Sequence, residues 1–152
     1  RGPPAGTDPA GQSGLNDRIY GETAVLLYPT LTGHGPMFHV WVHDDVDNEA
    51  RAGSISEVEL HIEMEHLAPE DEISVIFDGE ELGEPAIRNV AAENPNVPEE
   101  VTENSWLVWD LTPIQADRGK HEVKVVLDKR DHRIRSEIII GHVEIHINYA
   151  GI

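Results

Sequence analysis

Strict alternation of apolar and polar side chains is the feature that most constrains the fold of this chain. In the segment ELHIEMEH, residues 59–66, Leu60, Ile62 and Met64 alternate with acids and histidines. The segment GHVEIHINY, residues 141–149, repeats the pattern near the end of the chain. Because successive side chains of a β-strand point to opposite faces, both segments are predicted to be strands with one face in a core and one face outward.

Similar short segments, separated by turn signals, occur along the rest of the chain. We expect strands at residues 24–28, 37–43, 58–64, 73–78, 105–111, 123–127, 134–140 and 143–149. Residues 86–103 are polar and irregular, and residues 113–119 form a turn or a single helical turn. No segment shows a convincing amphipathic helix. The expected fold is therefore all-β: an antiparallel β-sandwich, as a jelly roll of about eight strands.

Two glycines mark local features of these strands. The dipeptide Asp78-Gly79 follows an apolar run and is typical of a two-residue hairpin turn. At Gly141 the parity of the apolar positions changes, from Ile138 and Ile140 to the odd-numbered positions that follow. A glycine at such a change indicates a β-bulge or a bend between two strands, and a single strongly bent strand is the alternative.

Composition bounds the domain organisation and the partners. The chain has 152 residues, enough for one domain. Residues 1–20 begin with a Gly- and Pro-rich stretch and are expected to be a linker or disordered arm, followed by a β-sandwich domain at 21–152. The net charge of −18 argues against nucleic acid and anionic membranes as partners. The chain has no cysteine, which excludes disulfides, and no apolar run of transmembrane length.

Four stretches together resemble a known family. They are VHDDV at 42–46, SEVELHIEMEHLAPEDEISVIFDGEEL at 56–82, SWLVWDLTPIQADRGKHEVKVVL at 105–127 and IIGHVEIHINY at 139–149. This order of core and turn residues resembles the galactose-binding-like β-sandwich modules at the C-terminal ends of TIM-barrel carbohydrate-active enzymes. The resemblance implies a jelly roll beside a catalytic domain. It brings no catalytic residues, although some relatives bind sugars through their loops.

An acidic segment, HDDVDNE at residues 43–49, is a candidate cation site. Its oxygen-bearing side chains could supply several of the six to eight oxygens that calcium takes. The candidate metal ligands are Asp44, Asp45, Asp47, Asn48 and Glu49. The spacing does not follow the EF-hand pattern, and the alternative is a solvated acidic turn.

Outward-facing aromatic residues are the candidate ligand-binding residues. In the strand at 37–43, alternation places Phe38 in the core and turns His39 and Trp41 outward. In the strand at 105–111, Trp109 faces the core and Trp106 faces outward. Sugar rings stack on exposed aromatic faces, so Trp41, Trp106 and His39 could bind a saccharide. The alternative is that a loop or a neighbouring domain covers the tryptophans.

The polar faces of the two alternating segments raise a separate question. Glu59, His61 and Glu63 share one face of the first segment, and His142, Glu144 and His146 share one face of the second. If the two strands pair antiparallel, these side chains form one array of His–Glu pairs. A solvated sheet face is the simplest interpretation. A zinc site, which needs converging ligands, and a docking surface are the alternatives.

Motifs of common enzymes are missing: the sequence has no Gly-x-Ser-x-Gly, no phosphate-binding loop and no His-Glu-x-x-His. We therefore expect a non-enzymatic accessory module of a larger carbohydrate-active or secreted protein, which packs on and stabilises a neighbouring catalytic domain. One alternative is a carbohydrate-binding module for a neutral polysaccharide, with or without calcium. Another is an adhesion or assembly domain. The carbohydrate hypothesis favours an extracellular location, which the sequence does not otherwise indicate.

Overall fold

A computed structural model of the chain describes residues 17–22, 25–27, 35–89, 104–133 and 136–150. Within these residues it contains ten strands and one short helix. In chain order they are β1 (Asp17–Glu22), β2 (Val25–Leu27), β3 (Met37–Val42), α1 (Val46–Arg51), β4 (Ile55–Glu65), β5 (Glu72–Phe77), β6 (Glu80–Glu81), β7 (Ala86–Asn89), β8 (Asn104–Asp110), β9 (Gly119–Lys129) and β10 (Ile138–Tyr149).

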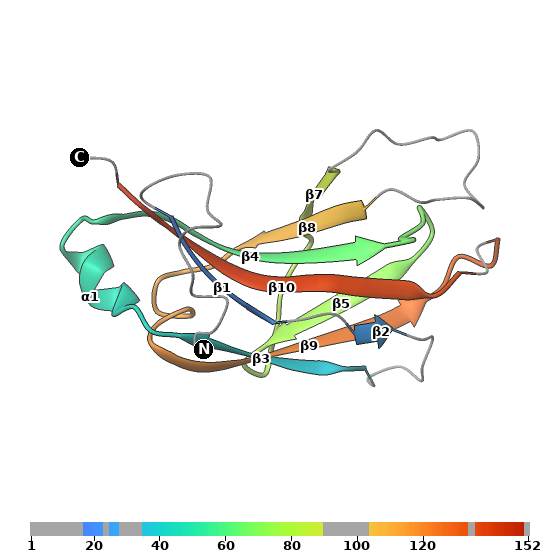
Figure 1. Ribbon diagram of the computed structural model, residues 1–152, viewed down its shortest axis with the longest axis horizontal. Helices are drawn as coiled ribbons and strands as arrows, with labels where there is room; N and C mark the ends of the chain where they lie inside the picture. The colour runs from blue at the N-terminus through green and yellow to red at the C-terminus, as the bar shows by residue number, and fades with distance from the viewer. Residues whose placement is uncertain (1–16, 23–24, 28–34, 90–103, 134–135, 151–152) are drawn as a thin grey trace.

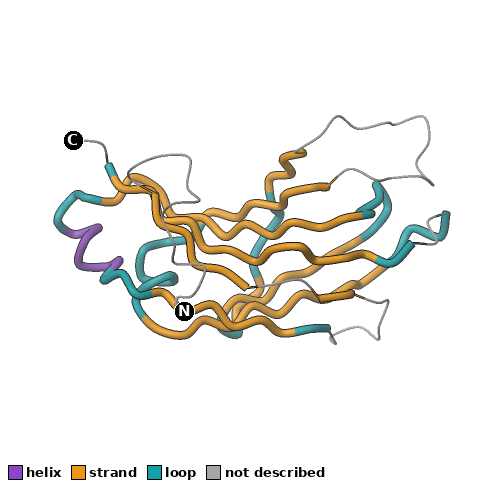
Figure 2. Tube along the Cα trace, in the orientation of Figure 1, coloured by secondary structure: helices purple, strands orange, loops and turns teal. Residues whose placement is uncertain are grey.

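The strands form two antiparallel sheets that pack face to face (Figure 1). The large sheet has the order β1-β10-β4-β8-β7, and β2 pairs with the other half of β10. The small sheet has the order β3-β9-β5-β6. Apart from the β5–β6 hairpin and the additional short strands β2 and β7, the chain alternates between the two sheets, and the strand orders β1-β10-β4-β8 and β3-β9-β5-β6 are those of a jelly roll. The expected all-β sandwich is therefore confirmed, and strand dominates the described chain (Figure 2).

The core lies between the sheets and follows the alternation of the sequence. Leu60, Ile62 and Met64 of β4 have no exposed surface, and the same holds for their partners in β10, which are Ile145, Val143 and Ile140. Phe38 of β3 and Trp109 of β8 also face inward, as expected. Burial of such apolar surface is the main stabilising contribution in a fold of this kind.

Both predicted glycine features are present. Asp78 and Gly79 have φ angles of 50° and 87°, and they connect β5 to β6 in a two-residue hairpin. At Gly141 the register of β10 against β4 shifts between Ile140 and His142, which is a β-bulge within one continuous strand. The bulge turns the apolar side chains on both of its sides into the core.

Three elements differ from the expectations. β1 begins at Asp17, inside the segment 1–20 that the sequence suggested as a linker, and residues 1–16 lie outside the described part of the chain. β7 occupies the start of a segment expected to be irregular. The acidic stretch expected as a turn contains the helix α1, whose Val46 is fully buried and whose Asp47 and Arg51 form an ion pair at 3.0 Å.

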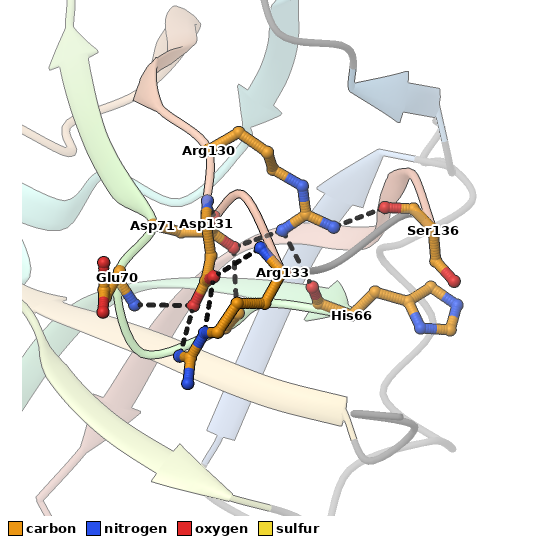
Figure 3. A network of polar contacts seen from close by, with 8 residues as sticks. His66, Glu70, Asp71, Arg130, Asp131, Arg133 and Ser136 are labelled. Atoms are coloured by element: carbon orange, nitrogen blue, oxygen red, sulfur yellow. Dashed lines mark hydrogen bonds and ion pairs between the residues drawn. The ribbon is translucent and has the colours of Figure 1, made fainter. Parts of the chain in front are cut away.

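The β4–β5 loop and the β9–β10 loop are joined at one end of the sandwich by a network of ion pairs and hydrogen bonds (Figure 3). We call this network the loop clamp. Asp71, in the β4–β5 turn, accepts hydrogen bonds from the Arg130 guanidinium and from the backbone N–H groups of Ala68 and Asp131. The Asp131 carboxylate accepts hydrogen bonds from Arg133 at 2.7–3.0 Å. These bonds outweigh the effect of burial and hold the pKa of Asp131 far below its usual range.

Candidate functional site

The outer face of the small sheet carries the candidate residues Trp41 and His39. Trp41 is 55% exposed and Met37 is 48% exposed, and both belong to β3, whose alternate side chains are buried. The His39 side chain lies between them in the sequence, and its Nε2 is 3.7 Å from Glu122 Oε2 of β9. Alternation positions all three side chains on one face. We call this surface the β3 face.

Cationic groups border the β3 face. All three lysines of the chain, Lys120, Lys124 and Lys129, lie on β9. Lys120 is opposite Trp41, with its ammonium nitrogen 6.0 Å from the centre of the indole ring, and Lys124 is opposite Met37. A cation at this distance is attracted to the face of the indole. This face is therefore locally more positive than expected for a chain of net charge −18.

The outer face of the large sheet carries the histidines and glutamates of β4 and β10. The strands pair antiparallel, with His61 opposite Glu144, His146 opposite Glu59 and His142 opposite Glu63. Each histidine also has a carboxylate neighbour within hydrogen-bond distance: His61–Glu59 at 2.9 Å, His146–Glu144 at 2.8 Å and His142–Glu63 at 2.7 Å. The predicted array of His–Glu pairs is therefore present, and we call it the His–Glu array.

The His–Glu array is less solvated than a simple outer face would be. Glu59 is only 5% exposed, and the imidazole rings of His61 and His146 stack with centres 3.7 Å apart. Trp106 is half-buried beside them, stacked near His142 and edge-on to His61. The candidate residue Trp106 thus has ring partners from its own sheet, whereas Trp41 presents an open indole surface.

Packing within the array changes the protonation of its members. Burial lowers the pKa of His61 and the nearby His146 lowers it further, while the neighbouring glutamates act in the opposite direction. Burial alone would raise the pKa of Glu144, but the hydrogen bond from His146 and the nearby histidines hold that pKa below its ordinary value. A neutral imidazole beside an ionised carboxylate is therefore expected around pH 7 at this position.

Geometry of the array also bears on the zinc alternative. Within the described ranges, no group of three or more His, Asp or Glu side chains converges in a way that could hold a metal ion. The rings of His61 and His146 lie face to face, so their nitrogens do not point at one common centre.

The candidate calcium ligands lie in and just before α1, and two of them accept hydrogen bonds from other side chains. Asp44 accepts hydrogen bonds from the hydroxyls of Tyr20 and Tyr149, one on each carboxylate oxygen. Asp45 precedes α1 and accepts a hydrogen bond from the Asn48 side chain at 2.9 Å. Asp47, Asn48 and Glu49 lie on the helix itself. Calcium binding by these residues stays a prediction.

Sequence reasoning missed one buried histidine. His121 of β9 has Nδ1 2.7 Å from Asp78 Oδ2 and Nε2 2.6 Å from the carbonyl oxygen of Asp117, and its ring stacks on Phe77. Both ring nitrogens therefore face acceptors of the fold. The available signal was its position in β9, where alternation places residue 121 in the same inward row as Val123.

Comparison with known proteins gives no assignment: no protein-family model and no curated protein matches the chain. The one described helix, α1, has six residues, and no described helix is long and apolar enough to cross a membrane.

Proposed function

We propose that this chain is a non-catalytic accessory module, of the galactose-binding-like type, that docks onto a neighbouring domain of a larger carbohydrate-active or secreted protein. The observation that carries the proposal is the exposure of Trp41 and Met37 on one face of β3. Large apolar side chains gathered on a surface with a polar rim are typical of interaction sites.

The contacts of the described histidines support a binding role over a catalytic one. His61, His142 and His146 are each held by a glutamate, and His121 is held by a carboxylate and a backbone carbonyl. A general base must be able to reach a proton of the substrate. In His121 both ring nitrogens are occupied by acceptors of the fold, which leaves neither of them for a substrate.

Thermal unfolding of the full-length protein tests the docking proposal. Trp41→Ala should lower the melting temperature of the full-length protein and leave that of the isolated module unchanged, because the indole stabilises only the docked state. Ile114→Ala is the matched control, because Ile114 is 70% exposed in the turn before β9. Equal melting temperatures for the Trp41→Ala and unmodified full-length proteins would refute docking through this face.

Carbohydrate binding is the second candidate function, and the open indole of Trp41 beside the half-exposed His39 favours it. The ring would supply a stacking surface, and the imidazole would supply a hydrogen-bonding group. Affinity electrophoresis against neutral polysaccharides, with calcium and with EDTA, tests it. Retardation that Trp41→Ala abolishes supports sugar binding at this residue, and retardation that EDTA abolishes supports a calcium site at Asp44–Glu49. No retardation on any polysaccharide rejects it.

A further inference from the structure

One edge of the small sheet carries no further strand among the described residues. β3 is the outermost strand, and β9 is the only described strand that pairs with it. The backbone N–H of Val125 donates to the Pro36 carbonyl at 3.0 Å. This hydrogen bond shows that the even-numbered residues of β3 direct their backbone groups toward β9. Because backbone groups alternate in direction along an antiparallel ladder, Met37, His39 and Trp41 turn their N–H and C=O groups toward the open edge.

The other described edge strands are short or charged. β6 has two residues, both glutamate; β2 has three; and β7 has four, including an arginine. β1 has the sequence DRIYGE, with three charged residues. Such features protect a sheet edge from pairing with another chain. β3 has the sequence MFHVWV, with no carboxylate, lysine, arginine or proline, and its register with β9 shows no bulge.

We propose that β3 pairs antiparallel with β3 of a second copy of this chain, about a twofold axis at His39. In this register His39 is opposite the partner's His39, and Met37 is opposite the partner's Trp41. The two copies have six outward N–H groups between them, on residues 37, 39 and 41. Each meets a carbonyl of the other copy, so the small sheets join into one continuous sheet.

Side chains on the β3 face complement this register. Met37 and the partner's Trp41 point to the same side of the joined sheet, where a thioether and an indole make a favourable contact. Each copy thereby covers part of the two large apolar side chains that β3 exposes. A register centred on another residue would place Met37 and Trp41 opposite different positions and lose this contact.

Charge also favours this surface for self-association. Two chains of net charge −18 repel each other, and the repulsion is weakest where cations are concentrated. The lysines of β9 lie next to β3, on the same sheet. The pairing does not rest on the proposed function, because it uses the backbone edge of β3 and does not require a neighbouring domain.

Single-cysteine variants test the register, since the chain has no native cysteine. In His39→Cys the two Cα atoms would be about 5.5 Å apart, which a disulfide can bridge. In Met37→Cys the two residues would be separated by four positions along the strands, about 14 Å, which a disulfide cannot bridge. We expect mild oxidation to dimerise His39→Cys and to leave Met37→Cys monomeric. Equal dimer yields for the two variants would overturn the register.

Sedimentation equilibrium of the unmodified chain tests the association itself. We expect a concentration-dependent dimer that tightens as salt screens the repulsion. His39→Pro removes the N–H at the twofold axis and should abolish the dimer, because an edge strand tolerates proline but cannot pair through it. His39→Ala keeps that N–H and should dimerise like the unmodified chain.

Two results would overturn the pairing: an unmodified chain that stays monomeric at high concentration, or a His39→Pro dimer as tight as that of His39→Ala. If His39→Pro does not fold, Trp41→Lys replaces it, because a lysine on the joining strand opposes pairing. A folded Trp41→Lys variant that still dimerises with unchanged affinity would equally reject the pairing.

Discussion

The loop clamp makes a quantitative prediction about the stability of this fold. In Arg130→Met the apolar stem of the side chain is kept and the guanidinium is removed. The Asp71 carboxylate, which has no exposed surface, then loses its ion pair and keeps two backbone N–H donors from the described part of the chain. The carbonyl oxygens of His66 and Ser136 lose their guanidinium donor as well.

The expected loss in the free energy of unfolding follows from the burial of Arg130 and Asp71. Breaking a buried ion pair by removal of one partner costs about 3–5 kcal/mol. The Arg130 side chain is 12% exposed, which allows some water to reach the site, so we expect a loss of about 3 kcal/mol. The Arg133 side chain is 38% exposed, and solvent screening therefore reduces the expected loss in Arg133→Met to about 1–2 kcal/mol.

Urea unfolding at pH 7, followed by tryptophan fluorescence, measures both losses. The double variant Arg130→Met/Asp71→Asn should lose less than the sum of its single variants, because it leaves no unpaired charge. A loss below about 1 kcal/mol for Arg130→Met, or a larger loss for Arg133→Met, would show that the clamp does not stabilise the loops as argued.

Three further variants test the packing and the titrating groups. Gly35→Ala should destabilise the fold by about 2–3 kcal/mol in urea unfolding, because its Cβ would lie 1.9 Å from the Val125 carbonyl oxygen. Because the pKa of His61 is lowered in the folded chain, the unfolded chain binds more protons than the folded chain below about pH 6.5. The free energy of unfolding should therefore fall as the pH drops through this range. His61→Gln should show a smaller fall between pH 7.5 and 5.5 in the same assay. Burial and hydrogen bonds to Asp44 raise the pKa of Tyr20 and Tyr149, so the free energy of unfolding should fall as the pH rises above about 10. In an absorbance titration, Asp44→Asn should let both tyrosines ionise at lower pH.

Each of these predictions can fail separately. An unchanged urea midpoint for Gly35→Ala would mean that the neighbouring strand moves away at little cost. Parallel pH profiles for His61→Gln and the unmodified chain would remove His61 as the titrating group. Tyrosine ionisation that is insensitive to Asp44→Asn would assign the shift to burial alone.

The strands of the sandwich could be predicted because alternation is a local property. Leu60, Ile62 and Met64 identify the inward face of β4 with no information from the rest of the chain. The assignment of Trp41 to an outward face and Trp109 to the core followed from the same rule. The rule also located the bulge at Gly141, since the parity change is visible in the sequence.

Other features depend on contacts that are distant in sequence. The helix α1 occupies a run of oxygen-bearing residues that resembles a loop, and its Val46 is buried in the core cluster. The spacing of Asp47 and Arg51 was the available local signal. In the His–Glu array, the ring stacking of His61 and His146 requires the register of β4 against β10, two strands that are far apart in the sequence.

The bulge at Gly141 makes chain length at this point as important as residue identity. β10 pairs with β2 before the bulge and with β1 after it, and both halves direct their apolar side chains inward. Deletion of this one residue would invert one half of the strand, so that its isoleucines faced solvent and its polar side chains faced the core. Among related chains, insertions and deletions should therefore be rarer at this position than in any surface loop, even though the residue itself contributes no side chain.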